Sequence, residues 1–412
     1  MTEVSIRGRL SAKRNKGLAP LFCVADNGNA ITVIRMANQN LNAAKNAKKD
    51  EFYTQLVDIE NELKHYKAHF KGKTVLCNCD DPRISNFFHY FSYNFEQLGL
   101  KKLITTCYKN QNRDLFSQND SERAIWLEYF GDKNNNRVPD PEEIGIHYLN
   151  GDGDFRSQEC IELLKEADIV VTNPPFSLFR EYVAQLMKYE KKFVILGNQN
   201  AIHYKDIFPL IKDNKVWLGS TLSFAKFKVP DYYEERSSRF WIDETGQKWR
   251  SFGNICWFTN LDISKRHEEL ILYKHYSSEA YHKYDNFDAI ECCPTANIPM
   301  DYDGLMGVPV TFLDKYNPEQ FEIVGILNHG CDSEYDMAKP ILNGKEKFSR
   351  ILIRRRQRTG DVVATCHGAK NVVETCHGAS LRTEQPHPYP KSDPALPMAA
   401  EPDAEYGVKS KL

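Results

Sequence analysis

The sequence predicts an α/β protein built on a doubly wound, mostly parallel sheet with an antiparallel edge. Short apolar runs alternate with segments of helical periodicity, as βαβ units require. Residues 169–171 are apolar on both faces, which is typical of a strand inside a parallel sheet. From residue 214 the pattern changes to the alternation of antiparallel strands, and Gly219 and Gly253 mark turns or strand ends.

Four apolar runs are the predicted parallel strands. They lie in KTVLCN (73–78), KKLITTCYK (101–109), EADIVV (166–171) and KKFVILGN (191–198). A helix is predicted within 50–70, because apolar residues recur there at helical spacing, namely Phe52, Leu56, Ile59 and Leu63. A second helix follows the third strand for the same reason, with Leu178, Phe179, Tyr182, Val183, Leu186 and Met187.

The composition is that of an ordinary globular protein. Of its 412 residues 41% are hydrophobic and 27% charged, and the formal net charge is -2, so a polyanionic partner would need a local basic surface. No apolar run approaches a membrane span and the first residues do not resemble a signal peptide, so we expect a cytoplasmic protein without a membrane partner. Eleven cysteines without a C-x-x-C pair indicate reduced thiols rather than a zinc site.

The tetrapeptide Asn173-Pro174-Pro175-Phe176 follows the third predicted strand directly, at the sheet edge where open α/β proteins bind ligands. The Asn173 side-chain oxygen and the Pro174 carbonyl could accept both N–H bonds of a conjugated amine. That would favour a pyramidal nitrogen and direct its lone pair at an electrophile. Proline fixes where its carbonyl points, and Phe176 offers a flat face to a planar substrate. The alternative is a proline-rich turn that only ends the strand.

The segment around this tetrapeptide, DIVVTNPPFSLFREYV, resembles motif IV of amino-methyltransferases that use S-adenosylmethionine. The following run KKFVILGNQNAIHYKDIFPLIKDNKVWLG is similar to the EcoRI-type adenine-specific DNA methylase family in particular. So are KKDEFYTQLVDIENEL, VLCNCDDPRISNFFHYF, GDGDFRSQECIELLKEAD, YNPEQFEIVGI and NGKEKFSRILIRR, so that the resemblance covers residues 45–356. It implies direct methyl transfer to the N6 amine of a flipped adenine in double-stranded DNA. Asn173, Pro174, Pro175 and Phe176 would be the catalytic residues.

Such families usually bind the cofactor with a glycine-rich turn after the first strand, and this chain has no glycine there. The resemblance implies that Asp80 or Asp81, followed by Pro82, replaces that turn and meets the methionine ammonium group. The alternative is that Asp81-Pro82 only begins a turn.

Two other blocks are implied to bind the cofactor. Asp154 would accept a hydrogen bond from its adenine while Phe155 packs on that ring, although Asp152 and Asp154 also suggest an incomplete calcium loop. Phe52-Tyr53-Thr54 would cover the methionine end, and its alternative is one turn of an amphipathic helix. No acidic residue that would bind the ribose is evident after the second strand.

An arginine cluster near residue 356 is the predicted DNA-phosphate contact, although such a run can also be a solvated face. It places five guanidinium groups in nine residues, namely Arg350, Arg354, Arg355, Arg356 and Arg358.

The chain is predicted to divide into an N-terminal arm (1–44), a catalytic domain (45–261), a DNA-contact region (262–356) and a disordered tail (357–412). The tail repeats VVATCHGAK as VVETCHGAS before a proline-rich stretch, so duplication explains its Cys-His pairs better than a metal site does.

Double-stranded DNA is the expected partner of a monomer, with a cognate restriction nuclease as an indirect one. The rivals are methylation of RNA adenine or protein glutamine, and a non-catalytic DNA-binding relative. The EcoRI-type blocks favour DNA, and the intact tetrapeptide disfavours a non-catalytic relative.

Overall fold

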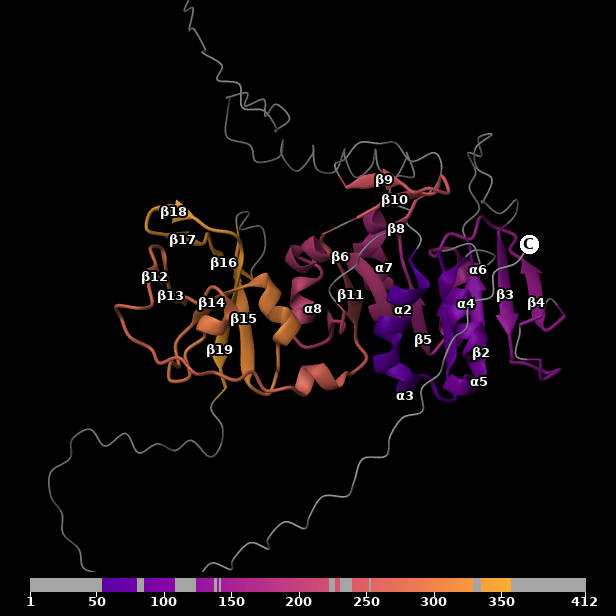
Figure 1. Ribbon diagram of the computed structural model, residues 1–412, viewed down its shortest axis with the longest axis horizontal. Helices are drawn as coiled ribbons and strands as arrows, with labels where there is room; N and C mark the ends of the chain where they lie inside the picture. The colour runs from indigo at the N-terminus through magenta and orange to yellow at the C-terminus, as the bar shows by residue number, and fades with distance from the viewer. Residues whose placement is uncertain are drawn as a thin grey trace, which may run out of the picture. The chain divides into compact units, whose positions relative to one another are not determined.

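The computed structural model describes residues 54–79, 85–107, 124–136, 139–140, 142–221, 227–229, 239–251, 253–328 and 335–356. These residues belong to one compact unit that ends at residue 358. They form an eight-stranded and a six-stranded sheet, two small sheets and several helices (Figure 1). The predicted α/β class with parallel strands is confirmed. The N-terminal arm and the tail, including its Cys-His pairs, lie outside the described residues.

The eight-stranded sheet has the order β4-β3-β2-β1-β5-β6-β11-β7. Its four central strands are mutually parallel, namely β2 (Lys102–Thr106), β1 (Thr74–Cys77), β5 (Ile169–Thr172) and β6 (Lys192–Asn198). Antiparallel strands flank them, namely β3 (Ile125–Tyr129) and β4 (Ile144–Tyr148) on one side, and β11 (Ile255–Thr259) and β7 (Trp217–Leu218) on the other. The four predicted strands are therefore confirmed, but antiparallel strands lie at both edges rather than one.

The central strands form because they are apolar on both faces. Val75, Val170, Val171 and Ile195 have no measurable exposure, as a strand covered on both sides requires. The additional antiparallel strands β3 and β4 were not predicted. β4 has no buried residue and β3 buries only Leu127 and Tyr129, so their apolar pattern is weaker than that of the central strands.

The predicted first helix is α2 (Leu56–Leu63), continued by η1 (Lys64–Tyr66) and α3 (Lys67–Phe70). Its buried face is formed by Ile59, Leu63, Tyr66 and Phe70, each with no measurable exposure. Leu56 does not belong to that face, because it begins the helix and is 38% exposed.

The remaining helices connect the strands. They are α4 (Asn86–Tyr93), α5 (Phe95–Leu98), α6 (Gln158–Glu166), α7 (Phe179–Lys188) and α8 (Phe208–Lys212), with the 3-10 turns η2 (Phe176–Leu178), η3 (Gln199–His203), η4 (Ser264–His267), η5 (Thr295–Asn297) and η6 (Val310–Lys315). The second predicted helix is α7, which buries Phe179, Tyr182, Val183 and Leu186. No described helix is both long and apolar enough to span a membrane.

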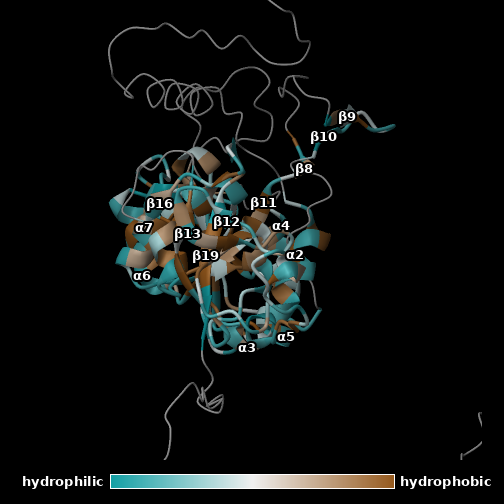
Figure 2. Cartoon of the chain, turned by 90° about the vertical axis from the view of Figure 1, so that its left-hand side faces the viewer, coloured by the Kyte–Doolittle hydropathy of each residue, from teal (hydrophilic) through white to brown (hydrophobic). Residues whose placement is uncertain are grey.

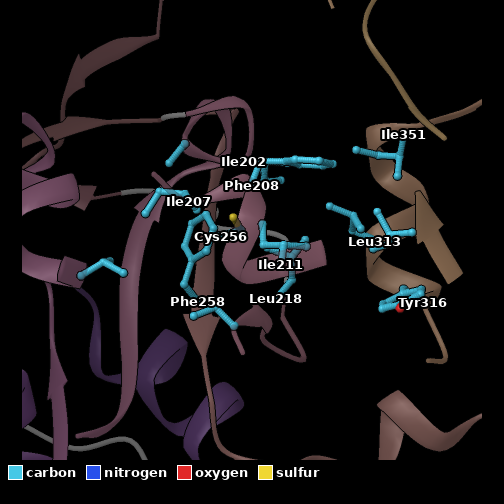
Figure 3. Packing of buried hydrophobic residues seen from close by; sticks show 14 of the residues in the cluster. Ile202, Ile207, Phe208, Ile211, Leu218, Cys256, Phe258, Leu313, Tyr316 and Ile351 are labelled. Atoms are coloured by element: carbon cyan, nitrogen blue, oxygen red, sulfur yellow. The ribbon is translucent and has the colours of Figure 1, made fainter. Parts of the chain in front are cut away.

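The six-stranded sheet has the order β12-β13-β14-β19-β15-β16. Its strands are β12 (Lys283–Tyr284), β13 (Phe287–Glu291), β14 (Met306–Pro309), β15 (Phe321–Leu327), β16 (Asp336–Ala338) and β19 (Arg350–Arg355), and β17 (Ile341–Leu342) pairs with β18 (Lys345–Glu346). One apolar cluster joins this region to the first sheet. Figure 3 shows Ile202, Phe208 and Ile211 on one side of that cluster and Leu313 and Ile351 on the other.

A third, small sheet lies between β7 and β11 in the sequence. It consists of β8 (Phe227–Lys228), β10 (Lys248–Arg250) and β9 (Phe240–Ile242), in that order. The predicted alternation over 214–229 is therefore shared between β7 and β8, which belong to different sheets. Gly219 follows β7 and Gly253 precedes β11, as predicted. A side chain at Gly219 would collide with Glu62 and Trp257, so a glycine is required there.

Candidate active site

Three strands place polar residues at one edge of the eight-stranded sheet. Asn78 follows β1, Cys107 follows β2 and Asn173 follows β5, and these strands run parallel in close register. Their carboxyl ends therefore meet at one edge, where open α/β sheets bind ligands.

The tetrapeptide lies where the sequence predicted it, between a buried strand and a helix. Asn173 and Pro174 are buried, whereas Pro175 and Phe176 are partly exposed. Leu178 N donates to Pro175 O at 2.9 Å, which begins the 3-10 turn that leads into α7. The Asn173 amide is thus held inside the sheet edge, and the Phe176 ring packs against a core cluster at the border of that edge.

Asn78 fastens the ends of β1 and β5 together. Its backbone oxygen accepts a hydrogen bond from the Thr172 hydroxyl, and its side-chain oxygen accepts one from the Tyr182 hydroxyl of α7. Burial raises the pKa of Tyr182 well above its ordinary value, so the hydroxyl keeps its proton and remains a donor. This network was not predicted from the sequence. A polar residue at the end of the apolar run VLCN was the available signal.

The turn after β1 adopts a glycine-like conformation without a glycine. Cys79 has φ of 81°, in the left-handed region that glycine tolerates best. Asp80, Asp81 and Pro82 lie outside the described residues, so their contact with a cofactor stays a prediction.

Thr54 lies beside the helix that follows this turn. Its backbone oxygen accepts a hydrogen bond from Asn86 Nδ2 at 2.7 Å, at the start of α4. Within the described part of the chain, the buried Thr54 Oγ1 has no hydrogen-bond partner. A buried hydroxyl without a partner is what a missing polar ligand would leave. Phe52 and Tyr53 lie outside the described residues.

The Asp154-Phe155 loop crosses the end of β2. Gly153, with φ of 78°, lies so close to the Cys107 carbonyl that a side chain there would collide with it. The predicted loop therefore lies at the same sheet edge as Asn173. Within the described ranges no group of three side chains could hold a metal ion.

Both carboxylate oxygens of Asp154 are engaged by one arginine. Arg156 Nε donates to Oδ1 at 2.8 Å and Nη2 to Oδ2 at 2.6 Å, while Nη1 donates to Glu181 at 2.9 Å. Phe155 is buried and packs edge-to-face on Tyr182, with ring centroids 5.0 Å apart. Asp154, through Arg156 and Glu181, and Phe155, through Tyr182, are thus both anchored to α7.

The arginine run does not form one solvent-facing surface. Arg350 is 7% exposed and forms a two-pronged ion pair with Glu291, with Nη2 at 2.7 Å and Nε at 3.0 Å from Oε1. This corrects the prediction that Arg350 contacts DNA, because its guanidinium group is used inside the sheet.

The later arginines differ from Arg350. Arg355 is partly buried, donates to the Met300 carbonyl and lies 3.6 Å from Asp303, whereas Arg354 and Arg356 are exposed. Arg358 lies outside the described residues. The exposed part of the predicted cluster is therefore Arg354 and Arg356.

Comparisons with known proteins identify the family of this chain. Residues 40–356 match the family model described as adenine-specific methyltransferase EcoRI. The Type II methyltransferase M.EcoRI of Escherichia coli is 50% identical over 324 residues, 78% of this chain and 97% of that protein. M.MgeORF184P of Mycoplasma genitalium is 39% identical, covering 77% of this chain and 99% of that protein, and M.MpnI of Mycoplasma pneumoniae is 36% identical, covering 77% and 98%.

No solved structure matches the chain. The family match spans the buried Asn173 loop and both sheets, and the three relatives are matched over nearly their whole length. The chain therefore belongs to the EcoRI-type family of adenine-specific methyltransferases, which methylate adenine at specific sites in DNA.

Proposed function

We propose that this protein transfers the methyl group of S-adenosylmethionine to the N6 amine of an adenine flipped out of double-stranded DNA. The observation that carries the proposal is the buried Asn173 amide at the carboxyl end of β5. That end is fixed to β1 through Thr172 and Asn78. A rigid acceptor at this edge can distinguish a planar amine from one becoming tetrahedral.

In this proposal Asn173 and Pro174 orient the amine. The Asn173 side-chain oxygen and the Pro174 carbonyl each accept one of its N–H bonds, and Pro175 limits the movement of that carbonyl. Phe176, partly exposed beside them, stacks on the flipped base. When bound, S-adenosylmethionine supplies the electrophilic methyl group. The methylated amine then loses its extra proton to solvent.

The cofactor would bind along the carboxyl edge of a doubly wound, Rossmann-like sheet. Thr54 and the Asp80-Asp81-Pro82 turn would hold the methionine end, together with Phe52 and Tyr53. The Thr54 hydroxyl, which has no partner among the described residues, and the left-handed Cys79 support this placement. Asp154 and Phe155 would meet the adenine end, where Arg156 already orients the carboxylate.

The region 262–356 would contact DNA outside the reacting base. Arg354 and Arg356 supply exposed cations there, and Arg355 supplies a partly buried one. Type II naming of the relatives supports a place in a restriction–modification system, and so a cognate nuclease that cuts the same site. We propose a cytoplasmic monomer.

The test is a transfer assay with labelled S-adenosylmethionine and, in parallel, duplex DNA, RNA and protein extract. Label should enter DNA alone, and digestion to nucleosides should yield 6-methyladenine and no methylcytosine. Label in RNA or in protein glutamine would favour one of the rival substrates. Methylcytosine would refute the proposed reaction.

A further inference from the structure

The small sheet β8-β10-β9 carries a row of side chains that the proposed active site does not use. Residues directly opposite each other in an antiparallel pair share one face of the sheet. Trp249 of β10 lies opposite Trp241 of β9 and opposite Lys228 of β8, so these three side chains share a face.

Arg239 joins the same face. It precedes Trp241 by two residues, and its Nη1 lies 2.5 Å from where a Gly253 side chain would begin. Ser251 N donates to Arg239 O at 2.9 Å, which extends the β9–β10 pairing, so Arg239 lies opposite Ser251, two residues beyond Trp249 on the same face. We call Lys228, Arg239, Trp241 and Trp249 the outer face.

The opposite face of this sheet covers the protein core. Phe227, Arg250 and Phe240 lie side by side in the register on that face. Phe227 is fully buried, and Phe240 packs against the same core cluster. The outer face consequently points away from the core, with Lys228 and Arg239 exposed and Trp241 38% exposed.

The sheet lies at the edge that carries Asn173. β11 follows the β9–β10 hairpin, and its first residue, Ile255, pairs with Asn198 at the carboxyl end of β6. Phe227 belongs to a hydrophobic core cluster against which both Phe240 and Phe176 pack. Figure 2 shows β9 and β10 projecting beyond the neighbouring described elements.

Both acidic side chains of the hairpin belong to its turn, and Asp243, which accepts a hydrogen bond from Trp249, offsets part of the positive charge of the outer face. Asp243 accepts hydrogen bonds from Thr245, from Trp249 Nε1 at 2.7 Å and from Gln247, and together they lower its pKa to about 2. Asp243 thereby orients the Trp249 ring, and Glu244 is exposed at the tip. Cations interleaved with indole rings are the chemistry that binds phosphates and unstacked bases.

We propose that the outer face binds the DNA that flanks the flipped adenine, with Lys228 and Arg239 on phosphates and Trp241 against an exposed base or sugar. This inference rests on the proposed function and names the second surface through which the same DNA is held. The hairpin begins and ends at the catalytic edge, so DNA presenting a base to Asn173 would pass beside it.

The experiment is a DNA titration of the full chain with a labelled duplex that contains the methylated site, repeated at several salt concentrations. Lys228→Ala and Arg239→Ala should each weaken binding and lower the slope of log affinity against log salt by about one. Trp241→Ala should weaken binding roughly 5- to 160-fold with little change in slope. Two controls should bind as the unaltered chain does, namely Ile242→Ala on the other face of β9 and Lys101→Ala at the amino end of β2.

The inference is overturned if Lys228→Ala, Arg239→Ala and Trp241→Ala bind DNA as tightly as the unaltered chain while that chain methylates adenine. Transfer of no label to DNA by the unaltered chain would instead refute the proposed function. Cofactor titration should be unchanged in every outer-face variant. Weaker cofactor binding would show damage to the fold and would also count against the inference.

Discussion

Strands β5 and β19 each lie inside a sheet, and each ends in residues that the sequence analysis assigned to function. All four residues of β5 are buried, and the polar residue Asn173 comes directly after them. β19 instead begins with a buried charge, Arg350, before three buried apolar residues, and exposes Arg354. The polar residue just past β5 is the proposed site, whereas the charge inside β19 has a partner within its own sheet.

That internal partner explains why the arginine run was misinterpreted. Glu291 lies 59 positions before Arg350 in the sequence, and only the pairing of β13, β14 and β19 brings the two together. The Tyr284 hydroxyl also donates to Glu291. Charge counting along the sequence cannot separate such a residue from its exposed neighbours.

The largest expected effect tests the buried charge of β19. Arg350→Met should lower the free energy of unfolding by about 3–5 kcal/mol, because it leaves the largely inaccessible Glu291 carboxylate, 13% exposed, without its cation. Arg354→Met, on the exposed end of the same strand, should change it by less than about 0.5 kcal/mol. Urea unfolding measures both. Equal losses in the two variants would show that burial does not distinguish these arginines.

The next effect tests the polar end of β5. Asn173→Ala should slow methyl transfer by about 2.7–4 kcal/mol, or roughly 100- to 1000-fold, because its hydrogen bond strengthens as the amine pyramidalises. Ser177→Ala in the same loop is the matched control. Single-turnover kinetics measure the loss, and cofactor titration should be unchanged. Full activity in Asn173→Ala would refute the catalytic assignment.

Phe176→Ala should affect a different step. Loss of stacking should weaken retention of the flipped base by about 1–3 kcal/mol. Fluorescence of 2-aminopurine at the target position measures base flipping directly. Normal flipping in this variant would limit Phe176 to packing against the core.

The next effect tests whether Asp154 binds the cofactor directly or only anchors the loop that crosses the end of β2. Asp154→Ala should weaken cofactor binding by about 1–3 kcal/mol if the carboxylate accepts a hydrogen bond from the cofactor. Arg156→Ala removes the group that holds this carboxylate but leaves the acceptor in place. Arg156→Ala should therefore weaken cofactor binding less than Asp154→Ala does. Isothermal titration with S-adenosylmethionine measures both variants, and equal losses would mean that Asp154 acts only by anchoring the loop.

The sequence predicted those parts of the fold that follow from the local pattern of apolar and polar residues. The central strands could be identified because their residues are apolar on both faces, and the tetrapeptide could be placed because it follows one of them. The six-stranded sheet could not be derived, since its strands pair across long separations, such as Met306 with Ile353. The Asn78–Tyr182 bond was missed for the same reason, as it spans 104 positions.

A smaller effect concerns the exposed end of β19. Arg354→Ala and Arg356→Ala should each lower the salt dependence of DNA binding by about one unit of slope, as loss of one phosphate contact does. Folding should be unaffected, in contrast to Arg350→Met. Fluorescence anisotropy at several salt concentrations measures the slope. An unchanged slope in both variants would remove this strand from the DNA interface.

The smallest effect lies in the segment that joins the two sheets. His267 of η4 lies 2.8 Å from Asp262, and this hydrogen bond raises the pKa of its imidazole above the ordinary 6.5. A raised pKa in the folded state means that charged His267 stabilises the fold fully below pH 6.5, and that this contribution is lost as the pH rises through the folded-state pKa. The ring is half-exposed, so solvent keeps the effect small.

Asp262→Asn removes the cause and should return the His267 pKa toward its ordinary value. Histidine-selective NMR titration of both proteins measures the shift, and urea unfolding above pH 6.5 should show a flatter pH dependence in the variant. Glu319, whose carboxylate lies 3.6 Å from the other ring nitrogen, is exposed and supplies a weaker attraction. Glu319→Gln should accordingly move the pKa less than Asp262→Asn does. The reverse order would mean that Glu319, before β15, rather than Asp262, after β11, chiefly sets the pKa of His267.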